Sequence, residues 1–417
     1  MKIEIIAIGN ELTSGRILNT TSSFAARRLF EAGYEISAMH TIGDSPILIG
    51  EALNQAIDRV DAVIVTGGLG ATDDDLTNEA VSLALNRPTE LNPEVLSHIR
   101  SHLDQISTAP VGKLEKLALL PSGAEVLNPS AKISGYRLVH NKKPIYFLPG
   151  IPSQMKQLMV EHVLPGLATW GEDNHLTTCQ RIFRIFNLQE SEVNARIATL
   201  SLHQSVQIGY YPVFPEVHLS LLVRDQKDIN ARKIFEESCR SVDSLLGEFV
   251  YGHDRDTLES IVGNLLTQSS LQLAVAESCT GGLIGQRLSN IPGSSAYFLG
   301  GIISYANSLK MNLLNVPEHL MKEFGAVSEQ TARAMADGAK TRCKADLGLA
   351  VTGIAGPDGG SPQKPVGTVY IGLADAHHTT VEKFLFTGNR RQIRDIAAHT
   401  ALNCVRKYLL RNQSPAS

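Results

Sequence analysis

Short runs of apolar side chains alternate, over the first 168 residues, with stretches in which apolar positions recur at helical spacing. In chain order this pattern predicts a strand at 3–8, a helix at 21–32, a strand at 34–41, a helix at 47–58 and a strand at 61–65. Strands that alternate with helices form a parallel sheet with helices on both faces, and ligands bind beyond the carboxyl ends of its strands. The polar segments 9–19 and 66–75 each follow a predicted strand, so we expect them to meet in one cleft.

The rest of the chain separates into two further units after a polar stretch that begins near Trp170. The middle unit is predicted to contain strands at 181–186, 206–211 and 217–223 and helices at 190–199 and 227–246. The last unit is predicted to contain strands at 271–276, 347–351, 368–373 and 381–386 and a terminal helix at 391–410. We therefore expect an α/β protein of three domains, at 1–168, 175–252 and 254–413, with a small α+β domain in the middle.

The composition is that of a folded protein, and it narrows the range of partners. Of the 417 residues, 43% are hydrophobic and 19% are charged, which is too little charge for a disordered chain. A formal net charge of −4 lacks the basic excess of a dedicated duplex-DNA binder. The five cysteines are scattered and never form a CxxC pair, which argues against a disulfide framework or a zinc site. The sequence contains neither a signal-peptide core nor an uninterrupted apolar stretch of about 18 residues, so we expect a cytoplasmic protein without a membrane partner.

The first candidate site combines the glycine cluster after the third predicted strand with acidic side chains. Its predicted members are Gly67, Gly68, Gly70 and Thr72 as substrate-binding residues and Asp73, Asp74, Asp75 and Glu11 as metal ligands. Glycines let backbone amides approach a phosphate, and carboxylates can hold a divalent cation that bridges phosphate oxygens during hydrolysis. The same pattern is typical of a glycine turn followed by a helix whose acidic first turn offsets the helix dipole. From the residues alone, both interpretations stay open.

The second candidate site lies in the segment Ala276-Glu277-Ser278-Cys279-Thr280-Gly281-Gly282. A serine at a strand-to-helix turn, beside free backbone amides, suits acyl transfer because the amides can stabilise an oxyanion. No histidine lies close in sequence, but Lys310 follows a predicted strand, and a desolvated lysine can accept a serine proton. Isolated residues of these types are more often a helix cap and a solvated surface lysine. Cys279 ranks well below Ser278 as a nucleophile, because a free cysteine is usually a small buried hydrophobe.

A third segment, at 351–368, is a long glycine-rich loop after a strand, and such a loop usually wraps a ligand. Arg390, Arg391 and Arg394 near the start of the terminal helix could receive a phosphate. The alternative is a surface loop with solvated arginines.

These motifs occur together in one order, and their combination resembles the CinA family of competence/damage-inducible proteins over essentially the whole chain. The first unit resembles the molybdopterin-binding-fold domain of that family, with a parallel or mixed sheet, through GNELTSGRILNT, TGGLGATDDDLT and FLPGIPSQM. The middle unit resembles the KH-like domain of long CinA proteins. The last unit resembles the α/β fold of nicotinamide-nucleotide amidase through AESCTGG, YANSLK, GAVS, TGIAGPDGG, KPVGTV and GNRRQIR.

The resemblance implies two hydrolases in one chain. The last domain would convert nicotinamide mononucleotide to nicotinate mononucleotide and ammonia, and the first would cleave ADP-ribose to AMP and ribose 5-phosphate. Carried over by motif, the catalytic residues are Ser278 as nucleophile, Lys310 as general base, and Tyr305 and Thr352 in support. The predicted substrate contacts of this domain are Thr280, Gly281, Gly282, Asn307, Gly353, Gly356 and Arg390.

The sequence departs from the family pattern at a few positions. Ala71 stands where many members have proline in the segment after the third predicted strand, and Ala306 stands where serine is frequent. The middle unit has no clear GxxG loop, the feature that clamps a nucleic-acid backbone in RNA-binding KH domains, so we expect no RNA binding there.

The cofactors and partners implied by the resemblance are few. The first domain would use a divalent metal cation, alone or with a monovalent cation, and the amidase domain would use no cofactor. The expected partners are nicotinamide mononucleotide, ADP-ribose and a second copy of the chain in a homodimer, with no nucleic acid. Two alternatives stay open: a nucleotide-binding protein of competence or DNA damage whose first domain is inactive, and molybdopterin binding, which rests on fold similarity alone.

Overall fold

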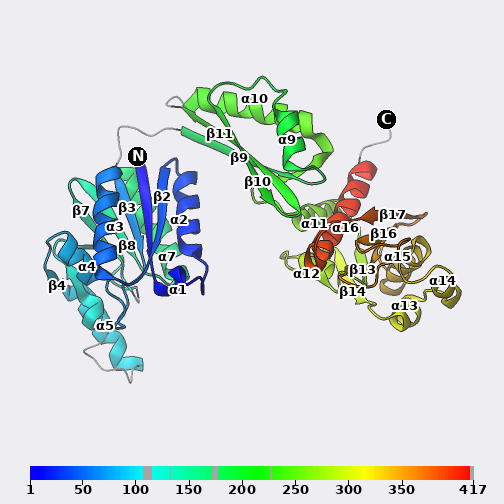
Figure 1. The fold of residues 1–417 in the computed structure, drawn as a ribbon, viewed down its shortest axis with the longest axis horizontal. Helices are drawn as coiled ribbons and strands as arrows, with labels where there is room; N and C mark the ends of the chain where they lie inside the picture. Colours follow the sequence, from blue (N-terminus) through cyan, green and yellow to red (C-terminus); the bar gives the residue numbers. More distant parts are fainter. Residues whose placement is uncertain (107–114, 132, 171–176, 226–227, 414–417) are drawn as a thin grey trace. The chain divides into compact units, whose positions relative to one another are not determined.

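The computed structural model describes residues 1–106, 115–131, 133–170, 177–225 and 228–413. The chain divides into two compact units, Met1–Cys179 with Val223–Lys233, and Gln180–Leu222 with Ile234–Ser417. The predicted fold class is confirmed: a mixed-sheet α/β domain comes first, a small α+β domain second and another α/β domain last (Figure 1). No helix within the described ranges is both long and apolar enough to cross a membrane.

The first domain contains a six-stranded sheet in the order β2-β1-β3-β8-β7-β6. Strands β2, β1, β3 and β8 run parallel, and β7 and β6 run antiparallel to their neighbours. The strands of this domain are β1 (Lys2–Ile8), β2 (Glu35–Ile42), β3 (Ala62–Thr66), β6 (Glu125–Val126), β7 (Tyr136–His140) and β8 (Lys143–Leu148), with a separate pair β4 (Thr89–Leu91) and β5 (Leu119–Pro121). All five residues of β3 are buried, as expected for a central strand covered on both faces.

Helices cover both faces of this sheet, because alternate side chains of each strand point to opposite sides. Helices α3 and α4 lie on one face and α2 and α7 on the other (Figure 1). Ile6 and Ile8 pack with the first pair of helices, and Ile3 and Ile5 pack with the second pair. The helices are α1 (Asn10–Thr13), α2 (Thr20–Glu31), α3 (Pro46–Arg59), α4 (Thr77–Ala84), α5 (Pro93–Ile106), the short η1 (Lys116–Ala118), and α7 (Pro152–Leu158), which continues through η2 (Met159–Val163) into α8 (Leu164–Trp170).

The middle domain is a four-stranded sheet in the order β10-β11-β9-β12, with two helices. Its elements are β9 (Thr177–Ile185), α9 (Glu190–Ile197), β10 (Val206–Val213), β11 (Glu216–Asp225), α10 (Asp228–Leu246), η3 (Gly247–Phe249) and β12 (Val250–His253). Helix α9 begins at a capping box, in which Gln189 and Glu192 satisfy each other's backbone amides.

The last domain has a five-stranded sheet in the order β14-β13-β15-β16-β17. Strand β13 pairs in parallel with both β14 and β15, and β16 and β17 are antiparallel additions. The strands are β13 (Leu273–Glu277), β14 (Phe298–Ile303), β15 (Leu347–Gly353), β16 (Thr368–Ala374) and β17 (Thr379–Leu385). The helices are α11 (Leu258–Gln268), α12 (Leu283–Ser289), η4 (Ser294–Ala296), α13 (Asn307–Leu314), α14 (Glu318–Glu323), α15 (Glu329–Cys343) and α16 (Arg390–Gln413).

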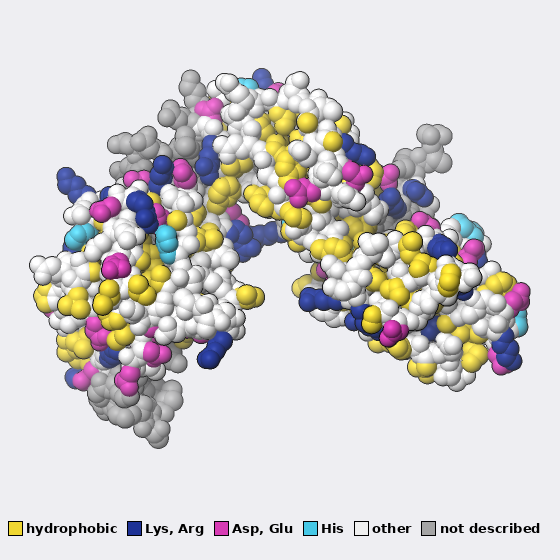
Figure 2. Space-filling view, viewed as in Figure 1, with side chains coloured by type: hydrophobic (Ala, Val, Ile, Leu, Met, Phe, Trp, Pro, Cys, Tyr) yellow, Lys and Arg dark blue, Asp and Glu magenta, His cyan; other side chains and the backbone are white. Residues whose placement is uncertain are grey.

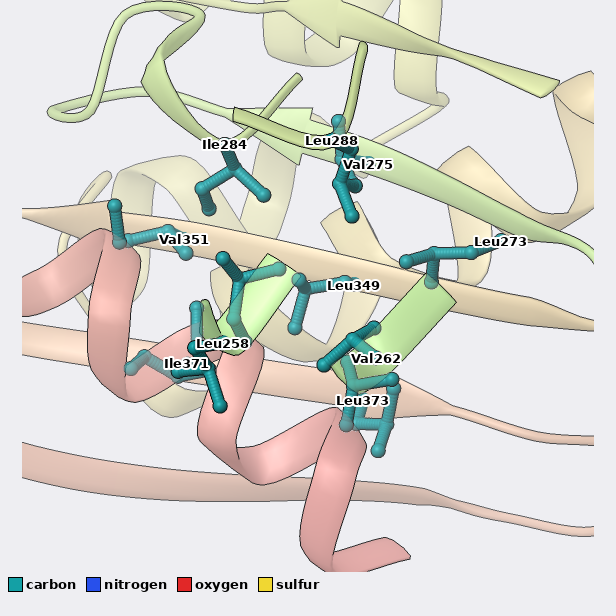
Figure 3. Packing of buried hydrophobic residues seen from close by; sticks show 14 of the residues in the cluster. Leu258, Val262, Leu273, Val275, Ile284, Leu288, Leu349, Val351, Ile371 and Leu373 are labelled. Carbon is teal, nitrogen blue, oxygen red and sulfur yellow. The ribbon is translucent and has the colours of Figure 1, made fainter. Parts of the chain in front are cut away.

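The core of this domain lies on both faces of its sheet. On one face, Val275 and Leu349 pack with Val262 of α11 and Ile284 of α12, and α16 closes the layer (Figure 3). On the other face, small side chains of β13 and β15 pack against α15.

The middle and last domains share this core within the second unit. Phe186 and Tyr251 of the middle domain are buried among the residues of the last domain. Glu216 of β11 lies 3.7 Å from the Nδ1 atom of His399 on α16, and Arg406 donates to the carbonyl oxygen of Glu248 at 2.8 Å. The two domains therefore contact each other through apolar and polar groups alike.

Candidate active site

Three parallel strands of the last domain end at the same edge of the sheet, and a pocket lies at that edge. Strand β13 leads into Ser278, β14 leads into Ser304 and Tyr305, and β15 ends with Thr352 and Gly353. The pocket has a volume of about 250 Å³. It is lined by Ser278, Cys279, Tyr305, Asn307, Lys310, Ala326, Val327, Thr352, Gly353, Ile354, Ala355, Gly356, Asp358, Gly359 and Arg390. The sequence predicted eight of the residues that the structure brings together here: Ser278, Tyr305, Asn307, Lys310, Thr352, Gly353, Gly356 and Arg390.

Lys310 lies in the first turns of α13 and is buried, with only 1% of its surface exposed. Its Nζ atom donates to the carbonyl oxygens of Ser304 at 2.7 Å and Tyr305 at 3.1 Å. Burial lowers the pKa of Lys310, because an ammonium group loses hydration in the interior. A lysine ammonium group has three N–H positions, and the two carbonyl contacts occupy two of them. The third position is available to the pocket that Lys310 lines. The surroundings thus favour an amine that can accept a proton.

Ser278 begins the turn that joins β13 to α12, and its backbone amide donates to Val351 at 3.0 Å. The preceding residue, Glu277, is 1% exposed, and its carboxylate accepts from the amides of Gly282, Ile284 and Gly285 at 2.8 to 3.2 Å. These are amides of the first turn of α12 that have no partner inside the helix. The Glu277 side chain therefore fixes the start of α12 relative to the strand that carries Ser278.

Arg390 joins the glycine-rich loop to the segment after β14. Its guanidinium group donates to the carbonyl oxygen of Gly356 at 2.6 Å and to the hydroxyl of Tyr305 at 2.7 Å. Arg390 is the first residue of α16, whose start is fixed by reciprocal hydrogen bonds between Asn389 and Gln392. A cationic side chain at the mouth of the pocket can receive an anionic group of a ligand.

Thr352 is fully buried, and its hydroxyl donates to the carbonyl oxygen of Ala326 at 2.7 Å. This bond holds the segment before α15 against the end of β15, and Ala326 and Val327 of that segment line the pocket. Their residue types did not predict that Ala326 and Val327 line the pocket, because only the fold brings them there. Asp358, a further lining residue, could have been found in the third glycine-rich segment by its charge.

Three predicted contacts, Thr280, Gly281 and Gly282, are not lining residues of the pocket. They form the turn behind Ser278, where Gly281 and Gly282 have left-handed φ angles of 60° and 95° that glycine adopts without strain. Arg391 is also outside the pocket, with its side chain 91% exposed near Asp395.

Cys279 lies next to Ser278 and is buried. Burial raises the pKa of the Cys279 thiol to about 12, and the charge of Glu277 adds to this effect. A thiol with such a pKa is a poor nucleophile near neutral pH, so the serine is the better-placed attacking group.

The first domain also brings loops together at the carboxyl edge of its sheet. Gly67 follows β3 with a φ of 105°, and a side chain there would clash with the carbonyl oxygen of Ile8 at the end of β1. Gly150, after β8, packs directly against Gly67. The hydroxyl of Thr77 donates to the carbonyl oxygen of Gly67 at 2.9 Å and joins the loop to α4. The loops after β1 and β3 therefore adjoin each other, as the sequence predicts.

The acidic side chains of this edge are held in different ways. Asp75 accepts from the backbone amide and the hydroxyl of Thr72 and folds back over Gly70, and Glu11 folds back over Gly9. Asp73 and Asp74 are exposed. Among the residues that the structure describes, no group of three or more histidine, cysteine, aspartate or glutamate side chains could hold a metal ion. As they lie in this structure, Glu11, Asp73, Asp74 and Asp75 do not by themselves form a complete metal site.

Charges on the visible surface are mixed, with Lys and Arg interspersed among Asp and Glu (Figure 2). This agrees with the small net charge of −4.

Comparisons with known proteins match all three parts of the chain. Family models match at residues 4–169 ("Probable molybdopterin binding domain"), 180–252 ("Damage-inducible protein CinA KH domain") and 255–409 ("CinA C-terminal domain"). Their order is the one that the resemblance implied. A CinA domain together with a domain of the molybdopterin-biosynthesis type points to an enzyme.

Relatives of the same length are known by similar names. A CinA-like protein of Desulfotalea psychrophila is 60% identical over 412 residues, which cover 99% of this chain and 100% of the relative. A CinA-like protein of Syntrophus aciditrophicus is 39% identical over 418 residues and covers 100% of both chains. The crystal structure of a competence/damage-inducible protein of Agrobacterium tumefaciens is 38% identical and covers 37% of this chain and 94% of its own, with a TM-score of 0.35. On the full-length identity and the three matched domains, this chain belongs to the CinA family.

Proposed function

We propose that the last domain hydrolyses the carboxamide of nicotinamide mononucleotide to nicotinate mononucleotide and ammonia. The observation that carries this proposal is the buried amine of Lys310, which lines the same small pocket as the Ser278 hydroxyl. The reaction class follows from that pair, because a serine beside a deprotonated lysine is a nucleophile with its own general base. The choice of substrate rests on the family resemblance and on Arg390, a cation that can receive the phosphate.

The reaction proceeds in two halves. The Ser278 oxygen bonds to the carboxamide carbon as its proton passes to the Lys310 amine, and the electron pair of the carbonyl moves onto oxygen. When that carbonyl re-forms, the carbon–nitrogen bond breaks, and Lys310 returns the proton to the leaving ammonia. Water then adds to the ester with the same lysine as base, which releases the carboxylate and restores the serine hydroxyl.

The test is incubation of the purified chain with nicotinamide mononucleotide and measurement of both products. We expect ammonia and nicotinate mononucleotide in equal amounts, and a mass increase on Ser278 when the reaction is quenched with acid. Failure to form either product at high enzyme concentration would refute this substrate.

A second activity, hydrolysis of ADP-ribose to AMP and ribose 5-phosphate, is proposed for the carboxyl edge of the first domain. The observation that favours it is the convergence of the loops after β1, β3 and β8, which places backbone amides and exposed carboxylates at one edge. Such an edge is the usual ligand site of an open α/β sheet.

The experiment for this activity compares ADP-ribose hydrolysis with and without a chelator. We expect chelation to abolish cleavage of ADP-ribose and to leave amide hydrolysis unaffected. Cleavage that survives exhaustive chelation would contradict the proposed divalent cation. A chain that binds ADP-ribose without cleaving it would instead support the alternative of an inactive, nucleotide-binding first domain.

A further inference from the structure

Two consecutive backbone amides in the turn between β13 and α12 have no oxygen acceptor among the described residues. The other amides from Ser278 to Gly285 are hydrogen-bonded, three of them to the Glu277 carboxylate. Within the part of the chain that the structure describes, the amides of Cys279 and Thr280 donate to no oxygen atom, and the group that they approach is the Cys279 sulfur, a weak acceptor. Amides that directly follow a nucleophilic serine in a strand-to-helix turn are suitable donors to an oxyanion.

The peptide between Cys279 and Thr280 is held from its other side by Arg394. The Nε atom of this half-buried arginine donates to the Cys279 carbonyl oxygen at 3.1 Å, and its Nη2 atom donates to the Thr280 carbonyl oxygen at 2.7 Å. In a trans peptide the carbonyl and the N–H group point in opposite directions. An arginine that holds the Cys279 carbonyl therefore turns the Thr280 amide away from itself.

The charge of Arg394 also changes the strength of that donor. A cationic group on a carbonyl oxygen polarises the whole peptide, and polarised hydrogen bonds in a chain strengthen one another. The amide of Thr280 then donates more strongly to a negative oxygen than an isolated peptide would.

We propose that Arg394 is a positioning residue for amide hydrolysis, which orients and polarises the Cys279–Thr280 peptide toward the oxyanion formed at Ser278. This inference rests on the proposed function and deepens it. The inference gives Arg394 a different role from Arg390. Of these two arginines, Arg390 lines the pocket, whereas Arg394 contacts the carbonyl oxygens of the turn.

The test uses the full chain and compares kcat with KM for nicotinamide mononucleotide. An oxyanion donor acts in the transition state, so Arg394→Ala should lower kcat about 100-fold and change KM by less than about threefold. Arg394→Lys keeps the charge but lacks the planar fork, and should lose less than the alanine variant. Millimolar guanidinium ion should restore part of the activity of Arg394→Ala and none to Ser278→Ala.

Arg391→Ala is the matched control, because this neighbouring arginine is exposed and lies outside the pocket. It should keep the wild-type kcat. A second readout is the rate at which a fluorophosphonate labels Ser278, since phosphonylation also places a negative oxygen beside the turn. Labelling should slow in both Arg394 variants. If one variant folds poorly, the labelling rate of the other still tests the inference.

The outcomes separate this inference from the proposed substrate. A raised KM with unchanged kcat would make Arg394 a substrate contact and overturn the inference, as would wild-type labelling rates in both folded variants. A wild-type chain that does not hydrolyse nicotinamide mononucleotide, yet shows labelling of Ser278 that depends on Arg394, would refute the substrate and support the positioning role.

Discussion

Lys310 shows how the position of a single residue decides its chemistry. Its residue type is usually charged and solvated, but here its amine is buried and bonded to two carbonyl oxygens. The sequence placed Lys310 after a strand and Ser278 at a turn, and both positions are confirmed. It could not reveal Ala326, which enters the pocket because the Thr352 hydroxyl binds its carbonyl oxygen. A hydrogen bond to a backbone carbonyl leaves no pattern in the type of residue that carries this carbonyl.

The serine and the lysine should act as a unit. Ser278→Ala and Lys310→Ala should each lower kcat by about three or more orders of magnitude with substrate binding largely kept. Lys310→Arg should not restore activity, because a guanidinium group stays protonated. The measurement is steady-state release of ammonia. Cys279→Ala should keep most activity; a dead Cys279→Ala beside an active Ser278→Ala would reassign the nucleophile to the thiol.

The lowered pKa of Lys310 predicts how the proposed amide hydrolysis depends on pH. Only the neutral amine accepts a proton, so kcat/KM should rise with pH and level off above the pKa of Lys310. Because burial lowers that pKa, the midpoint should lie below the ordinary lysine value of about 10.4. Initial rates from pH 6 to 10 measure this. A rate that is constant over the whole range would remove Lys310 as the base.

At the scale of elements, most strands and helices follow from the pattern of apolar residues, but α15 does not. Its buried face consists largely of small side chains, including Ala332, Ala336, Gly338 and Ala339, which carry little hydrophobic signal. They let the helix approach the sheet closely, and a side chain at Gly348 of β15 would clash with the backbone of α15. The antiparallel direction of β16 and β17 was also not predicted, because strand direction depends on which strands pair.

The start of α12 should depend on the Glu277 carboxylate. Glu277→Gln retains one oxygen acceptor and introduces an amide donor among three backbone amides, so it loses hydrogen bonds to a charged group. We expect this variant to lower the free energy of unfolding by about 1.5–3 kcal/mol. Urea unfolding measures the change, and Glu323→Gln on exposed α14 is the matched control. Equal stabilities of the two variants would show that the carboxylate does not anchor α12.

At the scale of the whole molecule, the last domain is not packed as a separate body. Phe186 and Tyr251 of the middle domain belong to its core, and Glu216 and Arg406 contribute to the polar contact between the two domains. The sequence predicted a boundary near Asp254, where the chain passes from one domain to the next. A boundary along the chain gives no information about which side chains cross it in space.

Fragments should reveal this coupling. A fragment from Asp254 onward contains every residue of the pocket and should hydrolyse the amide, but it loses the packing of Phe186 and Tyr251. Burial of each such side chain is worth about 1.5–3 kcal/mol, so this fragment should melt at a lower temperature than one that begins at Gln180. Thermal unfolding and ammonia release measure both properties. Identical melting temperatures would show that the shared core adds no stability.

The burial of the thiols has a consequence for the behaviour of the protein under oxidative stress. The described cysteines include Cys239, Cys279 and Cys404, in which burial raises the pKa to about 11, about 12 and about 12. Peroxide attacks the thiolate, and a thiol with a pKa of 12 is ionised in about one molecule in 10⁵ at pH 7. The proposed serine nucleophile, beside a thiol that stays protonated, should therefore keep working at peroxide concentrations that inactivate hydrolases with a cysteine nucleophile.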